Sequence, residues 1–312
     1  MRSKNLAWSR RTERAAAAIY YCGLRALGAT ALTRRLQDAG LILCYHNVVP
    51  DGEIHAGDPE LHLPRTRFEQ QMQWLADHYE MLSISQFVDR LMKGHSLRAT
   101  AVVTFDDGYA GVFEHAVPVL RRLSIPATVF VVAEAPGRSS GFWWDHPAIV
   151  VEAQTAAQRD RWLKEFRGDE AVILGGGRTA GGNGLPAAHR PADWATICAH
   201  AGAGIDIGAH SATHRSLPAL DAGELEYEIV AGRTTIRQAT GVWPEFFAYP
   251  YGLWDAQVRA AVCNAGYRAA LTVGSGLNRP GQDPWCLRRV NVPAQISDAA
   301  FEAWTAGFGA HN

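Results

Sequence analysis

Short apolar runs alternate along this chain with segments whose apolar residues recur every three or four positions. The runs are apolar on consecutive positions, as in strands covered on both faces, and lie at residues 41–48, 101–103 and 126–132. Residues 67–78 have helical periodicity, and the alternation of such helices with buried strands predicts a parallel sheet. A length of 312 residues suits a single α/β barrel with insertions.

The second half of the chain continues this pattern around one irregular stretch. A long helix is expected from Asp221, whose capping role is supported by Glu224 three residues later, to a stop at Gly241. Residues 167–191 are rich in glycine and predict a mobile insertion, because no GK[ST] sequence completes a phosphate-binding loop. One domain over residues 41–312 is therefore expected to carry this insertion.

Residues 1–40 differ from the rest of the chain in charge. Basic residues precede a short apolar run at 15–24, but Arg25 interrupts that run, and Arg34 and Arg35 follow. The run is shorter than the ~20 apolar residues that a transmembrane helix needs. The segment predicts a basic amphipathic helix, which packs on its own domain or lies against a membrane surface.

Charge and cysteine content narrow the class of protein. The chain has 30 Lys and Arg against 31 Asp and Glu, a balance without the basic footprint of a nucleic-acid-binding protein. Its five cysteines are scattered without a CxxC pair, which favours reduced core cysteines and a cytoplasmic location. Membrane association is expected only if the N-terminal helix contacts lipid.

The sequence TFDDGY at residues 104–109 places two neighbouring carboxylates, Asp106 and Asp107, directly after a buried strand. Side chains alternate along a strand, so both carboxylates can reach one site only where the strand ends. Two close carboxylates repel each other unless a cation neutralises them or one takes up a proton. A plain Asp-Asp-Gly turn between strand and helix is the alternative.

His210 and His214 are four residues apart, a spacing that points both imidazoles the same way on one helical turn. Taken alone, such a pair is as often structural as functional. Combined with one carboxylate of the Asp106 and Asp107 pair, two imidazoles can bind a metal and leave positions open for water and substrate. The second carboxylate would then be free to act as a base.

These motifs, in this order, resemble those of the polysaccharide deacetylases, also called the NodB-homology family or carbohydrate esterase family 4. The resemblance covers most of residues 41–295 and rests on TFDDGY, on HSATH at 210–214 and, in part, on AYPYG at 248–252. It implies a distorted (β/α) barrel with Asp106 as the catalytic base. The metal ligands that it implies are Asp107, His210 and His214.

The third motif departs from the family pattern. Ala248 stands where the family has an arginine that orients the base, so another group must hold Asp106, or it is held more loosely. The rest of the motif matches, and the resemblance implies that the backbone N–H of Tyr251 faces the oxyanion of the tetrahedral intermediate.

The family's late histidine, which acts as the acid, is also missing from its expected place near residues 270–274. However, LCYH at 43–46 resembles the N-terminal strand of the branch that acts on poly-N-acetylglucosamine, in which this histidine lies at the start of the chain. The resemblance implies that His46 protonates the leaving amine. A closed barrel makes its first and last strands neighbours, so either end can supply the group. A core histidine at a strand end is the alternative.

Aromatic residues supply candidates for sugar binding. Trp143 and Trp144 belong to an FWWD stretch similar to one in many members of this branch, and Pro250 and Trp254 lie at or near the third motif. Aromatic faces suit the apolar faces of pyranose rings, although tryptophan pairs are equally often part of a core.

The expected function is metal-dependent removal of N-acetyl groups from amino sugars, with Zn²⁺ as the expected metal. The implied partner is an acetylated amino-sugar polymer or a lipid-linked oligosaccharide. One alternative is an O-acetyl ester hydrolase acting on carbohydrate. Another, prompted by Ala248 and the missing late histidine, is a sugar-binding module with an impaired site.

Overall fold

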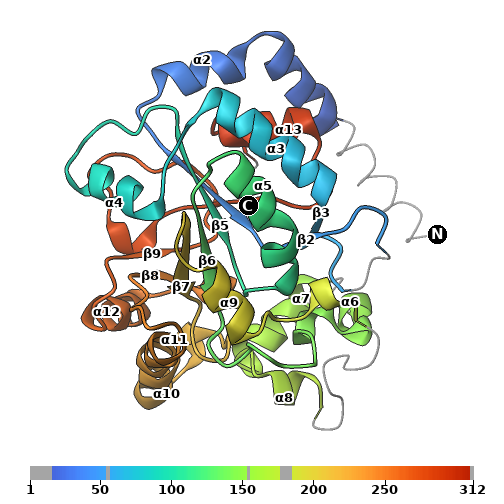
Figure 1. Cartoon of the computed structure of the whole chain (residues 1–312), viewed down its shortest axis with the longest axis vertical. Helices are drawn as coiled ribbons and strands as arrows, with labels where there is room; N and C mark the ends of the chain where they lie inside the picture. Colours follow the sequence, from blue (N-terminus) through green and yellow to red (C-terminus); the bar gives the residue numbers. More distant parts are fainter. Residues whose placement is uncertain (1–15, 54–56, 153–154, 176–184, 310–312) are drawn as a thin grey trace.

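Eight strands form one curved, parallel sheet in the computed structural model, which describes residues 16–53, 57–152, 155–175 and 185–309 (Figure 1). Seven of the strands follow the order β10-β1-β5-β6-β7-β8-β9, and β4 pairs with β5. Their bounds are β1 (Leu41–Tyr45), β4 (Glu80–Met81), β5 (Thr100–Phe105), β6 (Ala127–Val131), β7 (Ile205–Ala209), β8 (Phe246–Ala248), β9 (Ala269–Leu271) and β10 (Val290–Asn291). A separate two-stranded sheet joins β2 (Asn47–Val49) to β3 (His62–Pro64).

The late part of the chain closes this sheet into a barrel. Leu287 pairs in parallel with Leu271 of β9, and three residues later Val290 pairs in parallel with Leu43 of β1. Residues 287–291 therefore fill the gap between the last and the first strands. The predicted distorted (β/α) barrel is confirmed, and its first and last strands are neighbours.

Helices surround the barrel, as the alternating sequence pattern predicted (Figure 1). The α-helices are α2 (Ala29–Leu36), α3 (Arg65–His78), α4 (Ile84–Met92), α5 (Val117–Arg122), α6 (Pro147–Glu152), α7 (Ala156–Asp160), α8 (Glu170–Ile173), α9 (Trp194–His200), α10 (Ala222–Glu226), α11 (Gly232–Thr240), α12 (Ala256–Asn264) and α13 (Asp298–Thr305). Short π-helical turns are η1 (Val112–Ala116), η3 (Arg161–Glu165) and η6 (Tyr227–Ala231), and 3₁₀ turns are η2 (Trp143–Asp145), η4 (Ala187–His189), η5 (Leu217–Ala219), η7 (Pro250–Gly252) and η8 (Pro284–Cys286).

The long helix predicted to start at Asp221 is present as α10, η6 and α11 in succession. Asp221 and Glu224 form the expected reciprocal capping box, and Gly241 ends the helix in a left-handed conformation with φ 79°. The π-helical turn η6 in its middle was not foreseen. A π-helical turn changes the direction in which the side chains after it point, compared with a regular α-helix.

The interior of the barrel changes from apolar to polar along the strands. Alternate strand residues, Ile42 and Val102 among them, pack with α4 in one apolar cluster. The same inward-facing rows continue toward the carboxyl ends of the strands with Cys44, Thr104 and Asp106, all buried. A buried polar layer therefore lies above an apolar one.

The predicted glycine-rich insertion at 167–191 is only partly described, because residues 176–184 lie outside the described residues. The remainder is packed rather than loose. Ile173 and Leu174, at the end of α8, are buried in a cluster with Trp143 and Trp162. A mobile loop is therefore the wrong description for this part of the segment.

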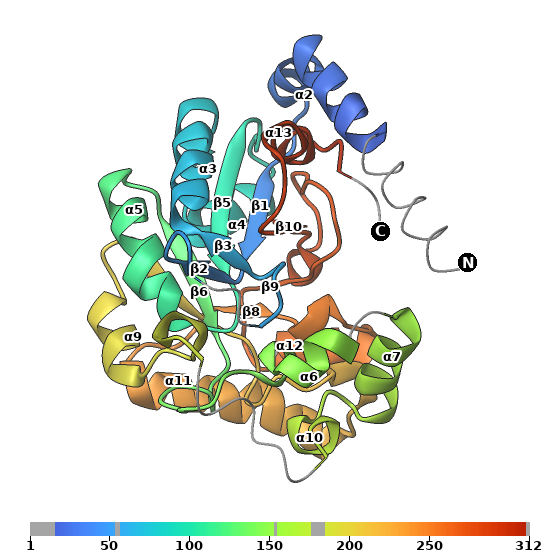
Figure 2. The same cartoon turned by 90° about the vertical axis from the view of Figure 1, so that its right-hand side faces the viewer.

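The described part of the N-terminal segment is helical at 16–26 and again in α2, separated by a turn with Gly28 at φ 67°. It lies next to α13 (Figure 2). Residues 1–15, and with them part of the predicted basic helix, lie outside the described residues. Among the described helices, none has the length and apolar character needed to cross a membrane.

All five cysteines are free, as predicted, but the prediction that they are core residues holds only for Cys44. Cys22 and Cys198 are exposed, and Cys263 and Cys286 are half-buried. Cytoplasmic location remains a prediction from the sequence.

Candidate active site

Two buried carboxylates stand side by side where β5 ends. Asp106 continues the inward-facing row of β5, and Asp107 directly follows it with φ 70°, a left-handed conformation that is uncommon outside glycine. Gly108, at φ 76°, completes the reversal of the chain. Because the strand ends here, both side chains reach the same space, as the sequence predicted.

His210 and His214 follow β7 in an irregular loop. The expectation that they share a helical turn is wrong, since Ser211 and His214 adopt left-handed conformations with φ 64° and 66°. The loop nevertheless brings the two rings together, and their Nε2 atoms are 3.1 Å apart. Convergence therefore comes from the loop and not from helical periodicity.

The atoms of Asp107, His210 and His214 fit a metal ion. Asp107 Oδ1 lies 3.5 Å from Nε2 of each histidine, and no hydrogen-bond partner for this buried oxygen is present among the described residues. Ligand atoms of a tetrahedral site with bonds of 2.0–2.2 Å are about 3.4 Å apart. Nδ1 of His210 must donate to the Ala248 carbonyl oxygen, at 2.8 Å, which leaves its Nε2 lone pair for a metal.

Burial favours the neutral form of all three side chains. Burial, with the charge of Asp106 beside it, raises the pKa of Asp107 well above its usual value. Burial also lowers the pKa of His210 and of His214, so both imidazoles are neutral at pH 7. Neutral imidazoles are the form that binds metals, and a bound cation would favour the charged form of Asp107.

Asp106 is held by a different partner, Arg289, whose side chain is completely buried. Nη1 and Nη2 of Arg289 donate to the two carboxylate oxygens of Asp106, each at 2.7 Å. Burial alone would raise the pKa of Asp106, but the charge of Arg289 outweighs it and holds that pKa well below its usual range. Of the two alternatives left by Ala248, the structure therefore has the first, in which another group, Arg289, holds Asp106.

Sequence reasoning missed Arg289. A signal was present in the sequence, because Arg288 and Arg289 lie between the apolar residues Leu287 and Val290. A charged residue in a buried strand needs a partner, but the sequence alone does not say which of the two arginines points inward or what it meets.

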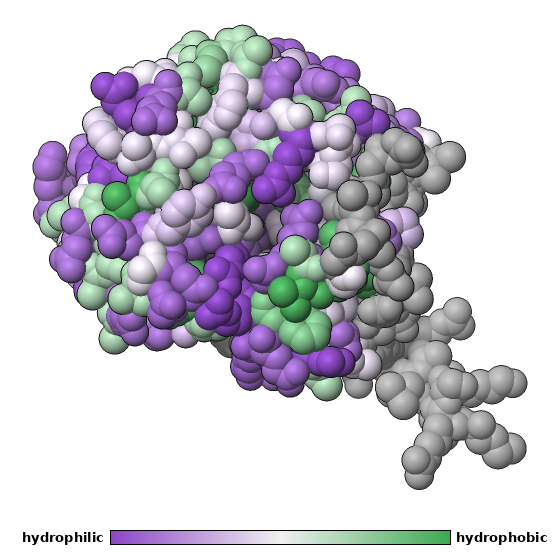
Figure 3. All heavy atoms as spheres, turned by 90° about the horizontal axis from the view of Figure 1, so that it is seen from below, coloured by the Kyte–Doolittle hydropathy of each residue, from purple (hydrophilic) through white to green (hydrophobic). Residues whose placement is uncertain are grey.

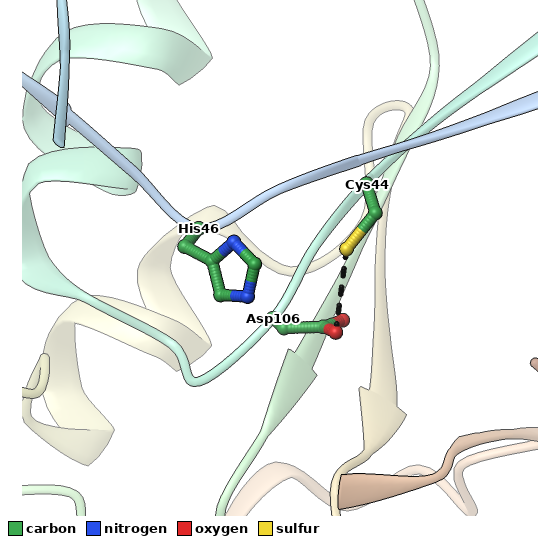
Figure 4. A group of neighbouring side chains, drawn as sticks. All are labelled: Cys44, His46 and Asp106. Carbon is green, nitrogen blue, oxygen red and sulfur yellow. Dashed lines mark hydrogen bonds between the residues drawn. The ribbon is translucent and has the colours of Figure 1, made fainter. Parts of the chain in front are cut away.

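His46 lies at the end of β1, next to the carboxylate of Asp106 (Figure 4). Cys44, two residues earlier, donates its thiol to Asp106 Oδ2 at 3.4 Å. Ring nitrogen, thiol sulfur and carboxylate oxygen all lie within 4.8 Å of one another. Burial lowers the pKa of His46 to about 4, so its imidazole is neutral at pH 7.

A cleft of about 430 Å³ opens above these residues. Its lining includes His46, both aspartates and both histidines, together with an aromatic wall made of Trp143, Trp144, Trp162 and Tyr251. Trp144 lies against the ring of His214, with centroids 4.6 Å apart, and its Nε1 donates to Tyr109 Oη at 2.8 Å. Tyr109 in turn donates to Asp145 Oδ2 at 2.6 Å, so a buried network fixes the wall.

The four residues predicted to bind substrate are not all in this cleft. Trp143 and Trp144 line it, but Pro250 and Trp254 are not among its lining residues. Pro250 is buried, and Trp254 stacks on Tyr249. The wall instead includes Trp162, which lies in the π-helical turn η3 and which no sequence motif indicated.

Tyr251 has a left-handed conformation, with φ 57°, in the turn η7. Its hydroxyl donates to the backbone oxygen of His214 at 3.1 Å. The side chain of Tyr251 therefore ties the third motif to the histidine loop and also lines the cleft.

Glu228, another residue that sequence reasoning missed, holds the loop between the two histidines. Its buried carboxylate accepts hydrogen bonds from the backbone N–H groups of Ala212 and Thr213, at 3.1 and 2.9 Å, and from the Thr213 hydroxyl. Gly232, one turn later, packs so closely that an added Cβ would lie 2.8 Å from Ala212 N. The π-helical turn η6 carries Glu228, so this turn faces the loop.

Comparisons with known proteins find similarity to polysaccharide deacetylases. The family model described as polysaccharide deacetylase matches residues 93–270, which include Asp106, His210 and Tyr251 but neither His46 nor Arg289. The protein YxkH of Bacillus subtilis (strain 168), assigned by its name to the polysaccharide deacetylases, is 25% identical over 265 residues, covering 84% of this chain and 75% of YxkH. The poly-beta-1,6-N-acetyl-D-glucosamine N-deacetylase of Staphylococcus aureus is 30% identical over 77 residues, 24% of this chain and 27% of that protein.

Solved structures show the same fold. IcaB from Ammonifex degensii aligns with a TM-score of 0.62 at 22% identity, covering 87% of this chain and 98% of IcaB. The deacetylase PplD of Streptococcus pyogenes aligns with a TM-score of 0.59 at 16% identity, covering 83% of this chain and 94% of PplD.

The contacts of Glu228 predict an effect on metal binding. The substitution Glu228→Gln removes one of the acceptor oxygens that hold the loop between the two histidines. We therefore expect the affinity for a divalent metal to fall by about 10–100-fold, as for other groups that orient metal ligands. Titration with Co²⁺, followed by its visible absorption, measures this directly. Glu226→Gln, an exposed change two residues earlier, is the matched control, and equal affinity of both variants would contradict the role of Glu228.

Proposed function

The chain belongs to the polysaccharide deacetylase family, and we propose that it hydrolyses N-acetyl groups of amino sugars in a metal-dependent reaction. The observation that carries this proposal is the arrangement of the two neighbouring carboxylates. Asp107 faces two neutral imidazoles with an oxygen that has no hydrogen-bond partner in the described part of the chain, whereas Asp106 beside it is engaged by an arginine. One carboxylate is thus available as a ligand and the other as a base.

Asp107, His210 and His214 would hold the metal, with Zn²⁺ preferred because a carboxylate and two imidazoles suit it. When bound, the metal polarises the amide carbonyl and lowers the pKa of the attacking water. Asp106 takes the proton from that water as it attacks the carbonyl carbon. The backbone N–H of Tyr251 stabilises the negative charge that develops on the carbonyl oxygen.

His46 gives a proton to the leaving nitrogen. Its low pKa means that the neutral ring must receive that proton during the reaction. Asp106 lies next to it, so the proton taken from water can pass from Asp106 through His46 to the nitrogen (Figure 4). The C–N bond then breaks to give a neutral amine and acetic acid, which ionises to acetate.

The substrate is proposed to be a polymer of N-acetylglucosamine type. The aromatic wall of the cleft supports a sugar ring as ligand, since aromatic faces pack well on pyranose rings. The name of the Staphylococcus aureus relative supports the same class, although only a quarter of each chain aligns. A lipid-linked oligosaccharide is the second predicted acceptor.

Two other functions were predicted as alternatives. An O-acetyl ester hydrolase would use the same residues and differs in needing less help from an acid, because an alkoxide leaves more readily than an amide anion. A sugar-binding module is less well supported, because the ligand set is complete and Arg289 holds the base.

We also propose that the N-terminal segment contacts an anionic membrane surface. Residues 1–37 contain eight basic residues and one acidic residue, Glu13, whereas the whole chain has a net charge of −1. Large apolar side chains of this segment are exposed, among them Ile19 (75%), Leu27 (84%) and Leu36 (68%). Exposed apolar side chains combined with positive charge are typical of helices that lie in the interface of an anionic membrane.

The other side of this segment packs on the barrel domain. Tyr21 accepts a hydrogen bond from Trp304 of α13 at 3.0 Å, and Arg34 of α2 lies over the rings of Trp74 and Tyr79. The segment therefore has one face fixed to the domain and one face free.

Figure 3, which views the molecule from the end away from α2, shows a mainly hydrophilic surface with small apolar areas.

The N-terminal segment and the cleft lie at opposite ends of the barrel. β1 begins five residues after α2 ends, at the amino ends of the strands, whereas the cleft opens at their carboxyl ends. In Figures 1 and 2, α2 lies at the top and α6 and α7, beside the cleft, lie in the lower part. This arrangement suits a long polymer better than a short saccharide attached to lipid.

Removal of metal and loss of the base test the proposed reaction. The wild-type protein is expected to release acetate from N-acetylglucosamine oligomers, to lose this activity with a chelator and to regain it with Zn²⁺. Asp106→Asn should lower kcat by about 10²–10⁴-fold, the usual contribution of a general base, while still binding metal. Asp107→Asn should instead lose the metal. Acetate release that persists after complete removal of metal would contradict the mechanism.

The acid role of His46 predicts a difference between amide and ester substrates. His46→Ala should lower kcat for an N-acetyl substrate by about 10²–10⁴-fold and should lower it much less for an O-acetyl ester of the same sugar. Both rates are measured as acetate release. An equal loss on both substrates would show that His46 has a structural role, because damage to the fold does not distinguish leaving groups.

The exposed apolar face predicts binding to anionic vesicles. The protein should sediment with vesicles of phosphatidylglycerol and phosphatidylcholine, less with phosphatidylcholine alone, and less at high salt. Leu36→Glu should weaken this binding, because a charge replaces a side chain that enters the interface. Val242→Glu, at a site with the same exposed fraction of 68% but remote in the sequence, is the control. Equal binding of the two variants would exclude the N-terminal segment as the contact.

A further inference from the structure

The ion pair between Arg289 and Asp106 stands out because it is buried and fully coordinated. Besides its two contacts with Asp106, the guanidinium donates from Nε to the Thr272 backbone oxygen at 3.0 Å and from Nη1 to the Thr104 hydroxyl at 3.2 Å. Thr104 and Asp106 belong to β5 or its end, and Thr272 directly follows β9. Arg289 itself lies in the segment that closes the barrel, so its side chain joins that segment to β5 and to the end of β9.

The guanidinium borders the apolar cluster inside the barrel. Ala248 of β8 is completely buried and belongs to the apolar cluster inside the barrel, together with Leu287 and Phe130. The guanidinium carbon of Arg289 lies 5.6 Å from the centre of the Phe130 ring. An arginine at 248 would have to enter the same barrel interior, so a barrel of this size is expected to hold only one of the two.

The contacts of Arg289 also separate the roles of the two aspartates. Both oxygens of Asp106 are occupied by guanidinium N–H groups, while Oδ1 of Asp107 faces His210 and His214 at 3.5 Å. Asp106 Oδ2 is further from His210 Nε2, at 3.8 Å. A carboxylate clamped at both oxygens is not free to rotate and join the metal ligands.

The same clamp excludes a second metal site. Cys44, His46 and Asp106 offer three ligand atoms within 4.8 Å of one another, an arrangement that by distance alone suits a metal (Figure 4). Arg289 already neutralises Asp106, and its positive charge would repel a second cation. The thiol of Cys44, whose pKa burial raises well above its usual value, stays protonated and acts as a hydrogen-bond donor.

We propose that Arg289 is the positioning residue for Asp106, and that the closing segment of the barrel supplies it in place of position 248. Arg289 keeps Asp106 pointed at the attacking water and out of the metal coordination sphere. Arg289 is not among the residues that line the cleft. This inference rests on the proposed function, because the orientation of the Asp106 carboxylate matters for the reaction only if Asp106 acts as the base.

Three variants test this role. Arg289→Ala removes the ion pair with Asp106. Arg289→Lys keeps the charge but cannot donate to both carboxylate oxygens in a fixed plane. The double variant, Arg289→Ala with Ala248→Arg, supplies a guanidinium from the neighbouring part of the barrel instead. Arg288→Ala, one residue away and exposed, is the matched control. For each, kcat and KM are measured by acetate release, bound metal by elemental analysis and folding by circular dichroism.

We expect Arg289→Lys and Arg289→Ala to lower kcat by about 10²-fold, the scale of misplaced reacting groups, with KM and bound metal unchanged. The double variant should recover at least tenfold over Arg289→Ala, which a purely structural role would not produce. Arg289→Lys retains the charge and keeps the test valid if the alanine variant does not fold.

Three results would overturn the inference: an Arg289→Lys protein with kcat within about threefold of wild type, a loss of activity matched by an equal loss of metal, or a double variant no better than Arg289→Ala. These results differ from a failure of the proposed function, in which the wild-type protein with bound metal releases no acetate at all.

Discussion

A single buried ion pair, between Arg289 and Asp106, links the closure of the barrel to its chemistry. Two charges taken out of water are costly unless each is fully compensated, and here the guanidinium meets both carboxylate oxygens and two further acceptors. The segment that carries Arg289 is also the one that pairs with β1 and β9. A shift of this segment would therefore open the barrel and leave Asp106 as an unpaired charge inside it.

The remaining site residues are placed by strained turns at the ends of neighbouring strands. Asp107, Ser211, His214 and Tyr251 all have positive φ without being glycine. Such conformations cost of order 1–3 kcal/mol each and persist only where the surroundings enforce them. Glu228 supplies part of that support, because it binds the loop between the two histidines through two backbone N–H groups and a hydroxyl. The strain allows side chains that are adjacent in sequence to face one point.

The molecule thus has two ends with different character. One end carries the cleft, in which aromatic side chains lie beside the carboxylates and imidazoles. The other carries the N-terminal segment, with its positive charge and exposed apolar side chains. The barrel keeps these two surfaces apart, so that binding at one does not cover the other.

The sequence by itself determined the alternation of helices with parallel strands and the principal chemical groups. Consecutive apolar runs and helical periodicity are local properties, and so are the position of Asp106 and Asp107 directly after a predicted strand and the four-residue spacing of His210 and His214. The capping box at Asp221 was equally predictable from the sequence, because all its contacts lie within three residues. These features follow from backbone geometry over a few residues, which a sequence displays directly.

Only the tertiary structure decided which groups meet across the barrel. The pairing of Arg289 with Asp106 joins residues 183 positions apart, and Trp162 enters the cleft wall from a turn with no motif. The helical turn expected for His210 and His214 was replaced by a loop that reaches the same convergence by a different backbone path. Such contacts depend on strand order and closure, since a charge inside a barrel can be compensated from any strand that lines it.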